Sequence, residues 1–365
     1  MYKLLVALLL ITTSSAMAQS ADLKSLQQQE TAMAPYAKDM IFADQAEDRI
    51  FADSAFTRMF VKALRTPYSF NYPFDSVITV SKIYAPDSSF RIFTWQFERD
   101  ESYFRQRGAI QMKTKDGSLK LFPLIDASQF TANPIDSVRS NTNWIGAIYY
   151  NIIEKQYQGK KYYTLFGYDD NDFATTRKWV DMLTFDDAGN PHFGGKYFNY
   201  PEDSLKPAQP AYRFCLEYKK DARARINFDP EMDMIIFDHL VSETNHQSEK
   251  YTLIPDGDYE GFKWKDGKWN YVEKVFDYKL QDGQAPVPEP IKDDAGNSNE
   301  RLLQEKSQKN ERKRPWRGFG EIFGIEGIVL TGVVRISVID KIVEYRKPSG
   351  FLMSPEGFFY IYPLV

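Results

Sequence analysis

The pattern of apolar and polar positions predicts helix near the N-terminus. Between residues 19 and 65, apolar side chains recur at roughly helical spacing, most clearly from about Lys38 to Leu64. Pro35 is expected to interrupt this stretch, and Thr66-Pro67 is expected to end it, because the residue before a proline disfavours the helical region. We therefore expect two helices that pack on the edge of the main domain.

From Ser69 to Tyr278 the pattern changes to short aromatic and β-branched runs separated by turn residues. Asp-Gly between two such runs, as at Asp116-Gly117 and Asp266-Gly267, is a strong hairpin signal. The runs expected to pair are 77–84 with 90–97, 109–114 with 119–124, 145–155 with 161–167, 180–185 with 193–198, 212–218 with 224–228, and 260–264 with 269–276. This spacing predicts a mainly β fold, an antiparallel array of hairpins or a meander that is either propeller-like or a sandwich.

Changes in composition divide the chain further. The expected parts are a signal peptide at 1–18, a helical segment at 19–66, an all-β domain at 67–283, a proline-rich polar linker at 284–317 and a tail rich in Gly, Ile and Val at 318–365. The linker is locally basic and is expected to be solvated. The tail is either an extra set of strands on the domain, a poorly ordered segment or an unrelated end.

The first 18 residues have the layout of a secretory signal peptide. Lys3 precedes the apolar run 4–11, and Ala16-Met17-Ala18 is a small-x-small cleavage site. The alternative, an uncleaved anchor, is disfavoured because a full span needs about 20 apolar residues. A lipoprotein would need a cysteine at position 19, which is Gln19. We expect an exported protein, periplasmic or extracellular, with no membrane span after cleavage.

Charge and cysteine content narrow the class of protein. The net charge of −4 favours neither nucleic acid nor an anionic membrane as the main partner. The single cysteine, Cys215, excludes an intramolecular disulfide framework and, within an apolar run, is expected to be buried.

Aromatic residues make up 15% of the chain, and three of them are candidate ligand-binding rings. Trp264 and Trp269 flank the hairpin at Asp266-Gly267, where they either form a stacking platform for a sugar or pair with each other across the strands. Tyr168 is the third candidate. Cross-strand pairing is the favoured interpretation for the two tryptophans.

Two acidic clusters are candidates for chemistry. Asp169, Asp170 and Asp172 surround an asparagine in a loop between strands, and oxygen ligands of this kind suit Ca²⁺, although the loop lacks the glycine and distant glutamate of an EF-hand. Asp256, Asp258 and Glu260 alternate along the chain and could bind a cation or supply an acid/base pair. For both clusters, ordinary turn geometry is the competing explanation.

The histidines and the search for known motifs identify no further catalytic or metal site. His192, His239 and His246 belong to no metal-binding motif, and the sequence contains no nucleophile elbow and no phosphate-binding loop. His239 follows Asp238 in a predicted strand, where adjacent side chains point to opposite faces, so these two residues are not expected to form a dyad.

Three strings carry a resemblance to a known group of proteins: Thr164 to Asp169, Leu183 to Gly194, and Met234 to Leu240. They are similar to a family of uncharacterised exported proteins of Bacteroidetes-type bacteria. The resemblance covers roughly Ser69 to Phe276 and leaves out the glycine-rich tail. It implies no particular activity and no site residues, because no activity is assigned to that family.

Together these observations favour a non-catalytic envelope or extracellular binding protein for a glycan or a protein partner. The alternative is a hydrolase of a polysaccharide or other envelope polymer that uses carboxylates of the two acidic loops. That mechanism requires the two loops to meet in one cleft, with one carboxyl of raised pKa.

Overall fold

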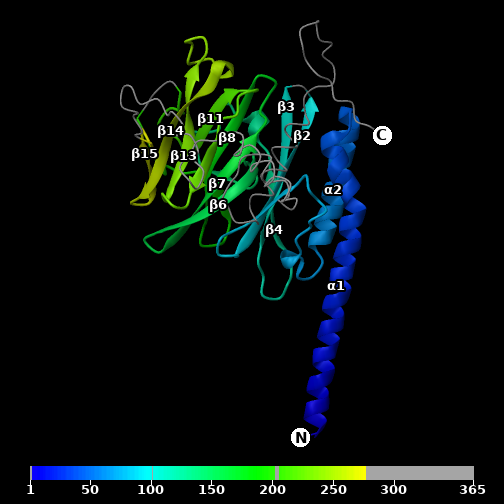
Figure 1. Ribbon diagram of the computed structural model, residues 1–365. Coiled ribbons are helices and arrows are strands. Elements are labelled where there is room, and N and C mark those ends of the chain that lie inside the picture. The colour runs from blue at the N-terminus through cyan, green and yellow to red at the C-terminus, as the bar shows by residue number, and fades with distance from the viewer. Residues whose placement is uncertain (1, 101, 202–204, 277–365) are drawn as a thin grey trace, which may run out of the picture.

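The computed structural model describes residues 2–100, 102–201 and 205–276. In this part of the chain the predicted class is confirmed: the fold is mainly β, with antiparallel sheets and two N-terminal helices. The elements form layers, in which the helix pair covers a first sheet, a second sheet follows and a third lies on the far side (Figure 1). The predicted linker at 284–317 and tail at 318–365 lie outside the described residues.

The helical pair is confirmed, but the predicted interruption at Pro35 is wrong. Helix α1 (Tyr2–Phe42) continues through Pro35, and the chain breaks instead before α2 (Ala46–Leu64). Buried side chains on both sides of Pro35 hold α1 against the same core; these are Leu26, Met33, Ala37 and Met40. At the break, the Arg49 guanidinium donates to the carbonyls of Ala43 and Asp44, at 2.8 and 2.9 Å.

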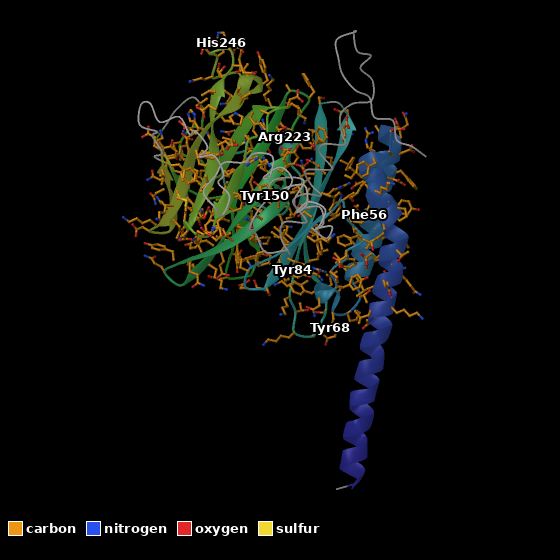
Figure 2. The ribbon with its side chains drawn as sticks, viewed as in Figure 1. Phe56, Tyr68, Tyr84, Tyr150, Arg223 and His246 are labelled. Carbon is orange, nitrogen blue, oxygen red and sulfur yellow. The ribbon has the colours of Figure 1, made fainter. Side chains whose placement is uncertain are left out.

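The helices cover a face of the first sheet. Phe56 of α2 is fully buried and meets Trp95 edge to face, with ring centroids 5.3 Å apart (Figure 2). Trp95 Nε1 donates to Asp53 of α2 at 3.0 Å, and Arg107 forms an ion pair with the same carboxylate at 2.9 Å. Within the described residues, no helix has both the length and the apolar character that crossing a membrane requires.

Replacing Pro35 with alanine should raise the free energy of unfolding by about 1–3 kcal/mol. Pro35 is exposed in the interior of α1, where it has no N–H for the carbonyl of Thr31 and its ring crowds that carbonyl. Urea denaturation measures the change, with Lys38→Ala at another exposed position of α1 as the control, expected to change stability by less than about 0.5 kcal/mol. A Pro35→Ala protein no more stable than the wild type would contradict this account of the helix.

The first sheet has the strand order β1-β2-β3-β4. Its strands are β1 (Ser81–Tyr84), β2 (Phe90–Asp100), β3 (Tyr103–Met112) and β4 (Lys120–Ile125). Side chains of β2 alternate between two cores: Phe93, Trp95 and Phe97 face the helices, whereas Phe90 and Ile92 pack toward the second sheet. Both faces of this sheet are therefore buried over much of its length.

The second sheet lies in the middle of the molecule. Its order is β5-β9-β8-β7-β6, and β11 pairs with β8 outside that path. The strands are β5 (Arg139–Ser140), β6 (Ile148–Tyr157), β7 (Lys160–Asp169), β8 (Thr175–Phe185), β9 (Pro191–Phe193) and β11 (Phe214–Lys219). Its side chains also alternate: Leu165 and Trp179 pack toward the first sheet, whereas Phe166 and Val180 pack toward the third.

The third sheet has the order β10-β15-β14-β13-β12, antiparallel except for the pair β10 and β15. Its strands are β10 (Phe198–Asn199), β12 (Ile226–Asp229), β13 (Met234–Ser242), β14 (Leu253–Lys265) and β15 (Lys268–Val272). Short 3₁₀ turns at Ser69–Asn71, Ser128–Phe130 and Lys250–Thr252 complete the described elements.

The Asp-Gly hairpins are confirmed, but one predicted pairing is wrong. Asp116-Gly117 joins β3 to β4 and Asp266-Gly267 joins β14 to β15. The runs 212–218 and 224–228 do not form a hairpin: β11 pairs with β8 in the second sheet, and β12 pairs with β13 in the third. The reason is that β11 buries both faces, with Cys215 toward the first sheet and Phe214 toward the third, so it belongs in the middle layer. Cys215 is buried as expected, and burial raises the pKa of its thiol.

Candidate functional site

The predicted site residues fall in three separate places. The tryptophans lie at the hairpin of β14 and β15, the Asp169–Asp172 loop lies between the first and second sheets, and the Asp256–Glu260 segment lies in β14 beside an open cleft. Each place has its own local chemistry.

The candidate ligand-binding rings are largely enclosed by protein. Trp264 and Trp269 are paired in register, with ring centroids 5.2 Å apart in an edge-to-face arrangement. Trp269 is fully buried, and its Nε1 donates to Thr164 at 3.1 Å. Tyr168 is also buried and donates its hydroxyl to Asp170 at 2.7 Å. Of the three, only Trp264 is partly open to solvent, so the geometry matches the cross-strand pair and not a shared stacking platform.

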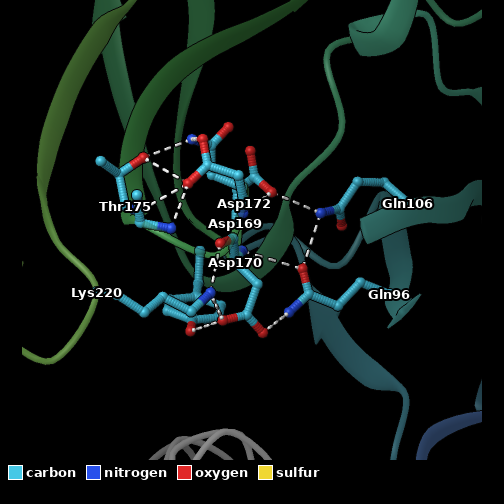
Figure 3. A network of polar contacts seen from close by, with 10 residues as sticks. Gln96, Gln106, Asp169, Asp170, Asp172, Thr175 and Lys220 are labelled. Carbon is cyan, nitrogen blue, oxygen red and sulfur yellow. Dashed lines mark hydrogen bonds and ion pairs between the residues drawn. The ribbon is translucent and has the colours of Figure 1, made fainter. Parts of the chain in front are cut away.

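Asp170 joins the first and second sheets (Figure 3). Its Oδ2 accepts from Gln96 at 2.7 Å, and its Oδ1 accepts from Tyr168 and from Lys220, the latter at 2.9 Å. Gln96 lies on the face of β2 that is turned toward the second sheet. The carboxylate is 3% exposed, so its charge is compensated inside the protein by donors from two sheets.

Asp169 lies beside Asp170, and its carboxyl has a raised pKa. Its Oδ1 accepts from Gln106 and from the N–H of Asn171, both at 2.9 Å. Burial raises the pKa of Asp169 to about 6, against the lowering effects of the Asn171 N–H and the Arg177 charge. Gly146 makes room for this arrangement, because a Cβ there would lie 2.1 Å from Cγ of Gln106.

The carboxylate of Asp172 accepts hydrogen bonds from its own loop. Its Oδ1 accepts from the backbone N–H groups of Ala174 and Thr175, at 2.8 and 2.7 Å. The three aspartates therefore direct their oxygens toward different protein donors. Among the described residues, no group of three or more His, Cys, Asp or Glu side chains is arranged to hold a metal ion. Calcium binding at Asp169, Asp170 and Asp172 stays a prediction.

The Asp256–Glu260 segment forms a bulge in β14, not a turn before it. The register with β13 shifts between Asp238 and Leu240, and these residues pair with Tyr259 and Pro255. Gly257 adopts a φ of +96°, and Asp256 Oδ1 accepts from the N–H of Asp258 at 3.0 Å. The extra residues turn the side chain of Asp256 toward β13.

The bulge brings Asp256 to His239, a partner that the sequence did not suggest. His239 Nδ1 and Asp256 Oδ2 are 2.8 Å apart, and the two side chains are 31% and 28% exposed. Partial burial acts to raise the pKa of Asp256, but the hydrogen bonds from Asp258 N–H and His239 outweigh it, so this pKa is lowered. Among the described residues His239 Nε2 makes no hydrogen bond, and His239 lines a cleft.

The cleft has a volume of about 750 Å³, which is typical of small-ligand sites. Both hydrogen-bond acceptors and hydrogen-bond donors line it. Its lining residues are the carboxylates Asp258, Glu260 and Glu273, the cations Lys206 and Lys274, the imidazole of His239, and the rings of Pro201 and Tyr271.

A buried ion pair forms one wall of this cleft. Glu260 and Lys206 are 3.0 Å apart, and their side chains are 9% and 6% exposed. Tyr271 donates its hydroxyl to Glu260, and the Lys206 ammonium lies 4.7 Å from the centroid of the Tyr271 ring. Because these three groups satisfy one another, they form a fixed wall, whereas Asp258 and Glu273 are exposed and open to a ligand.

The two acidic clusters do not share this cleft. Asp169, Asp170 and Asp172 are absent from its lining, and the carboxyl whose pKa rises to about 6 belongs to their group. The condition for joint catalysis by the two loops is therefore not met in the described residues.

Sequence reasoning missed Lys206, Tyr271, Glu273 and Lys274. The hairpin register carries a signal for two of them: Gly261 pairs with Val272, so Tyr271 and Glu273 lie on the same face of the sheet as Glu260. Lys206 comes from a distant loop, and no local pattern indicates that it reaches Glu260.

Comparison with protein-family models, with curated proteins and with solved structures gave no match.

Proposed function

We propose that this chain is an exported, non-catalytic binding protein of the envelope or the extracellular space, and that a glycan occupies the cleft beside β14. The observation that carries the proposal is the cleft of about 750 Å³, which carboxylates, lysines, an imidazole and the Tyr271 ring line together. A sugar hydroxyl both donates and accepts, so a wall that offers donors and acceptors together can form hydrogen bonds with it. The N-terminal signal-peptide pattern supports export.

The test compares binding of a panel of envelope and plant glycans by the wild type and by Asp258→Asn/Glu273→Gln. We expect at least one glycan to raise the melting temperature of the wild type, because a ligand that binds only the folded state stabilises it. A hydrogen bond to a charged group contributes about 1.5 kcal/mol or more, so the variant should bind roughly tenfold more weakly per carboxylate neutralised.

The matched control is Asp221→Asn/Glu231→Gln, which neutralises two exposed carboxylates that do not line the cleft. It should bind as the wild type does. A panel in which no glycan binds, or a cleft variant with unchanged affinity, would overturn the assignment of this cleft to glycans.

The second candidate is a hydrolase acting at the same cleft, and the pair of His239 and Asp256 favours it. A carboxylate on Nδ1 orients an imidazole so that Nε2 can take a proton from water, which is general-base chemistry. If the protein is a hydrolase, a glycan that binds should also be cleaved, and His239→Gln should abolish release of reducing ends while retaining affinity. Binding without cleavage supports the non-catalytic proposal.

A further inference from the structure

The exposed side of α2 carries a second hollow, far from the cleft. It has a volume of about 320 Å³ and is lined by Thr57, Arg58, Val61, Lys62 and Arg65. The three cations follow one another at intervals of four and three residues, so they lie on one face of the helix. We call this hollow the α2 groove.

The cations of the α2 groove have no counter-ion in the described part of the chain. None of the three takes part in an ion pair or side-chain hydrogen bond there, although all three are exposed. The nearby acidic residue of α2, Asp53, is buried on the opposite side of the helix and forms an ion pair with Arg107 at 2.9 Å. The positive charge of the groove is therefore uncompensated, even though the whole chain is acidic.

Helix stability alone does not account for this arrangement. Cations in the last turn favour the negative end of the helix dipole, which explains Lys62 and Arg65. Arg58 lies further from that end, and like charges four residues apart destabilise a helix by a few tenths of a kcal/mol.

A hydroxyl in the groove also lacks a partner. The Oγ1 atom of Thr57 is buried and makes no hydrogen bond among the described residues. A buried hydroxyl without a partner is unfavourable, and Thr57 is one of the residues that line the hollow. The groove thus presents two guanidinium groups and one ammonium group around a hollow of about 320 Å³.

We propose that the α2 groove binds a phosphate group. Guanidinium groups match the oxygens of phosphate with paired hydrogen bonds, and a lysine adds a point charge. The same chemistry is presented by a phospholipid headgroup and by free phosphate compounds. This site does not depend on the glycan cleft, and its cations come from one helix.

The experiment measures binding of the full chain to two sources of phosphate. One arm uses vesicles of phosphatidylcholine with and without phosphatidylglycerol, and the other uses pyrophosphate in solution. The test variant is Arg58→Gln/Lys62→Gln/Arg65→Gln, since glutamine keeps the helix propensity of the residues replaced. The control, Lys263→Gln/Lys265→Gln/Lys268→Gln, makes the same change of charge at exposed positions of the third sheet, on the far side of the molecule (Figure 1).

We expect the wild type and the control to bind at least one of the two phosphate sources. A basic residue near an anionic surface contributes about 1 kcal/mol, so losing three should weaken phosphatidylglycerol-dependent binding roughly a hundredfold. Binding to vesicles identifies a headgroup, and binding to pyrophosphate alone identifies a free compound. Binding to neither, or an equal loss in the control, overturns the proposal; melting curves confirm that both variants fold.

Discussion

Replacing Arg213 with methionine should lower the free energy of unfolding by about 3–5 kcal/mol. Arg213 and Asp181 form an ion pair at 3.2 Å whose side chains are only 1% and 4% exposed. Arg213, which directly precedes β11, also donates to the carbonyls of Pro134 in a loop and of Phe193 in β9. Without Arg213, the Asp181 carboxylate would be left buried and uncompensated.

Two further measurements separate the lost charge pair from lost packing. The double variant Arg213→Met/Asp181→Leu should be more stable than Arg213→Met alone, because it leaves no buried charge. Burial already raises the pKa of Asp181, against the lowering effect of Arg213. In Arg213→Met this pKa should rise further. The loss of stability of Arg213→Met relative to the wild type should therefore shrink as the pH falls. A double variant no more stable than the single one would show that packing dominates.

Replacing Asp169 with asparagine should stabilise the protein at neutral pH by up to about 3 kcal/mol. The pKa of Asp169 is about 6 in the folded protein and 3.8 in the reference state. A difference of about two units corresponds to roughly 3 kcal/mol, since one unit is 1.36 kcal/mol. Asparagine has nearly the same shape, can still accept from Gln106, and carries no charge that must be buried.

The sign of the pH dependence follows from the raised pKa. Between about pH 4 and pH 6 the folded state binds more protons at Asp169 than the unfolded state does, so this group makes the protein less stable as the pH rises through that window. Above about pH 6 the destabilisation is complete, and below about pH 4 it is absent.

The measurement is urea denaturation of the wild type and of Asp169→Asn from pH 4 to pH 8. The difference in stability should grow across the window and then level off, whereas Asp221→Asn, at an exposed aspartate, should differ little from the wild type at any pH. A constant difference would mean that Asp169 is not the titrating group.

The candidate site was only partly predictable. The alternation of Asp256, Asp258 and Glu260 indicated that three acidic residues lie close together, and two of them line the cleft. The sequence did not predict a partner for His239, and the structure pairs it with Asp256 on the next strand. The register shift in β14 creates this pairing, and hydrophobic alternation does not encode a bulge.

The sequence by itself determined the fold class, the helical pair and the Asp-Gly hairpins. These depend on interactions between residues close along the chain: helical spacing, strand alternation and the positive φ that glycine allows, as at Gly117 and Gly267. Only the tertiary structure decided that α1 runs through Pro35, that β11 joins β8, and that Lys206 reaches Glu260. In each of these cases burial between layers outweighs local preference, because the stabilising contacts come from residues distant in sequence.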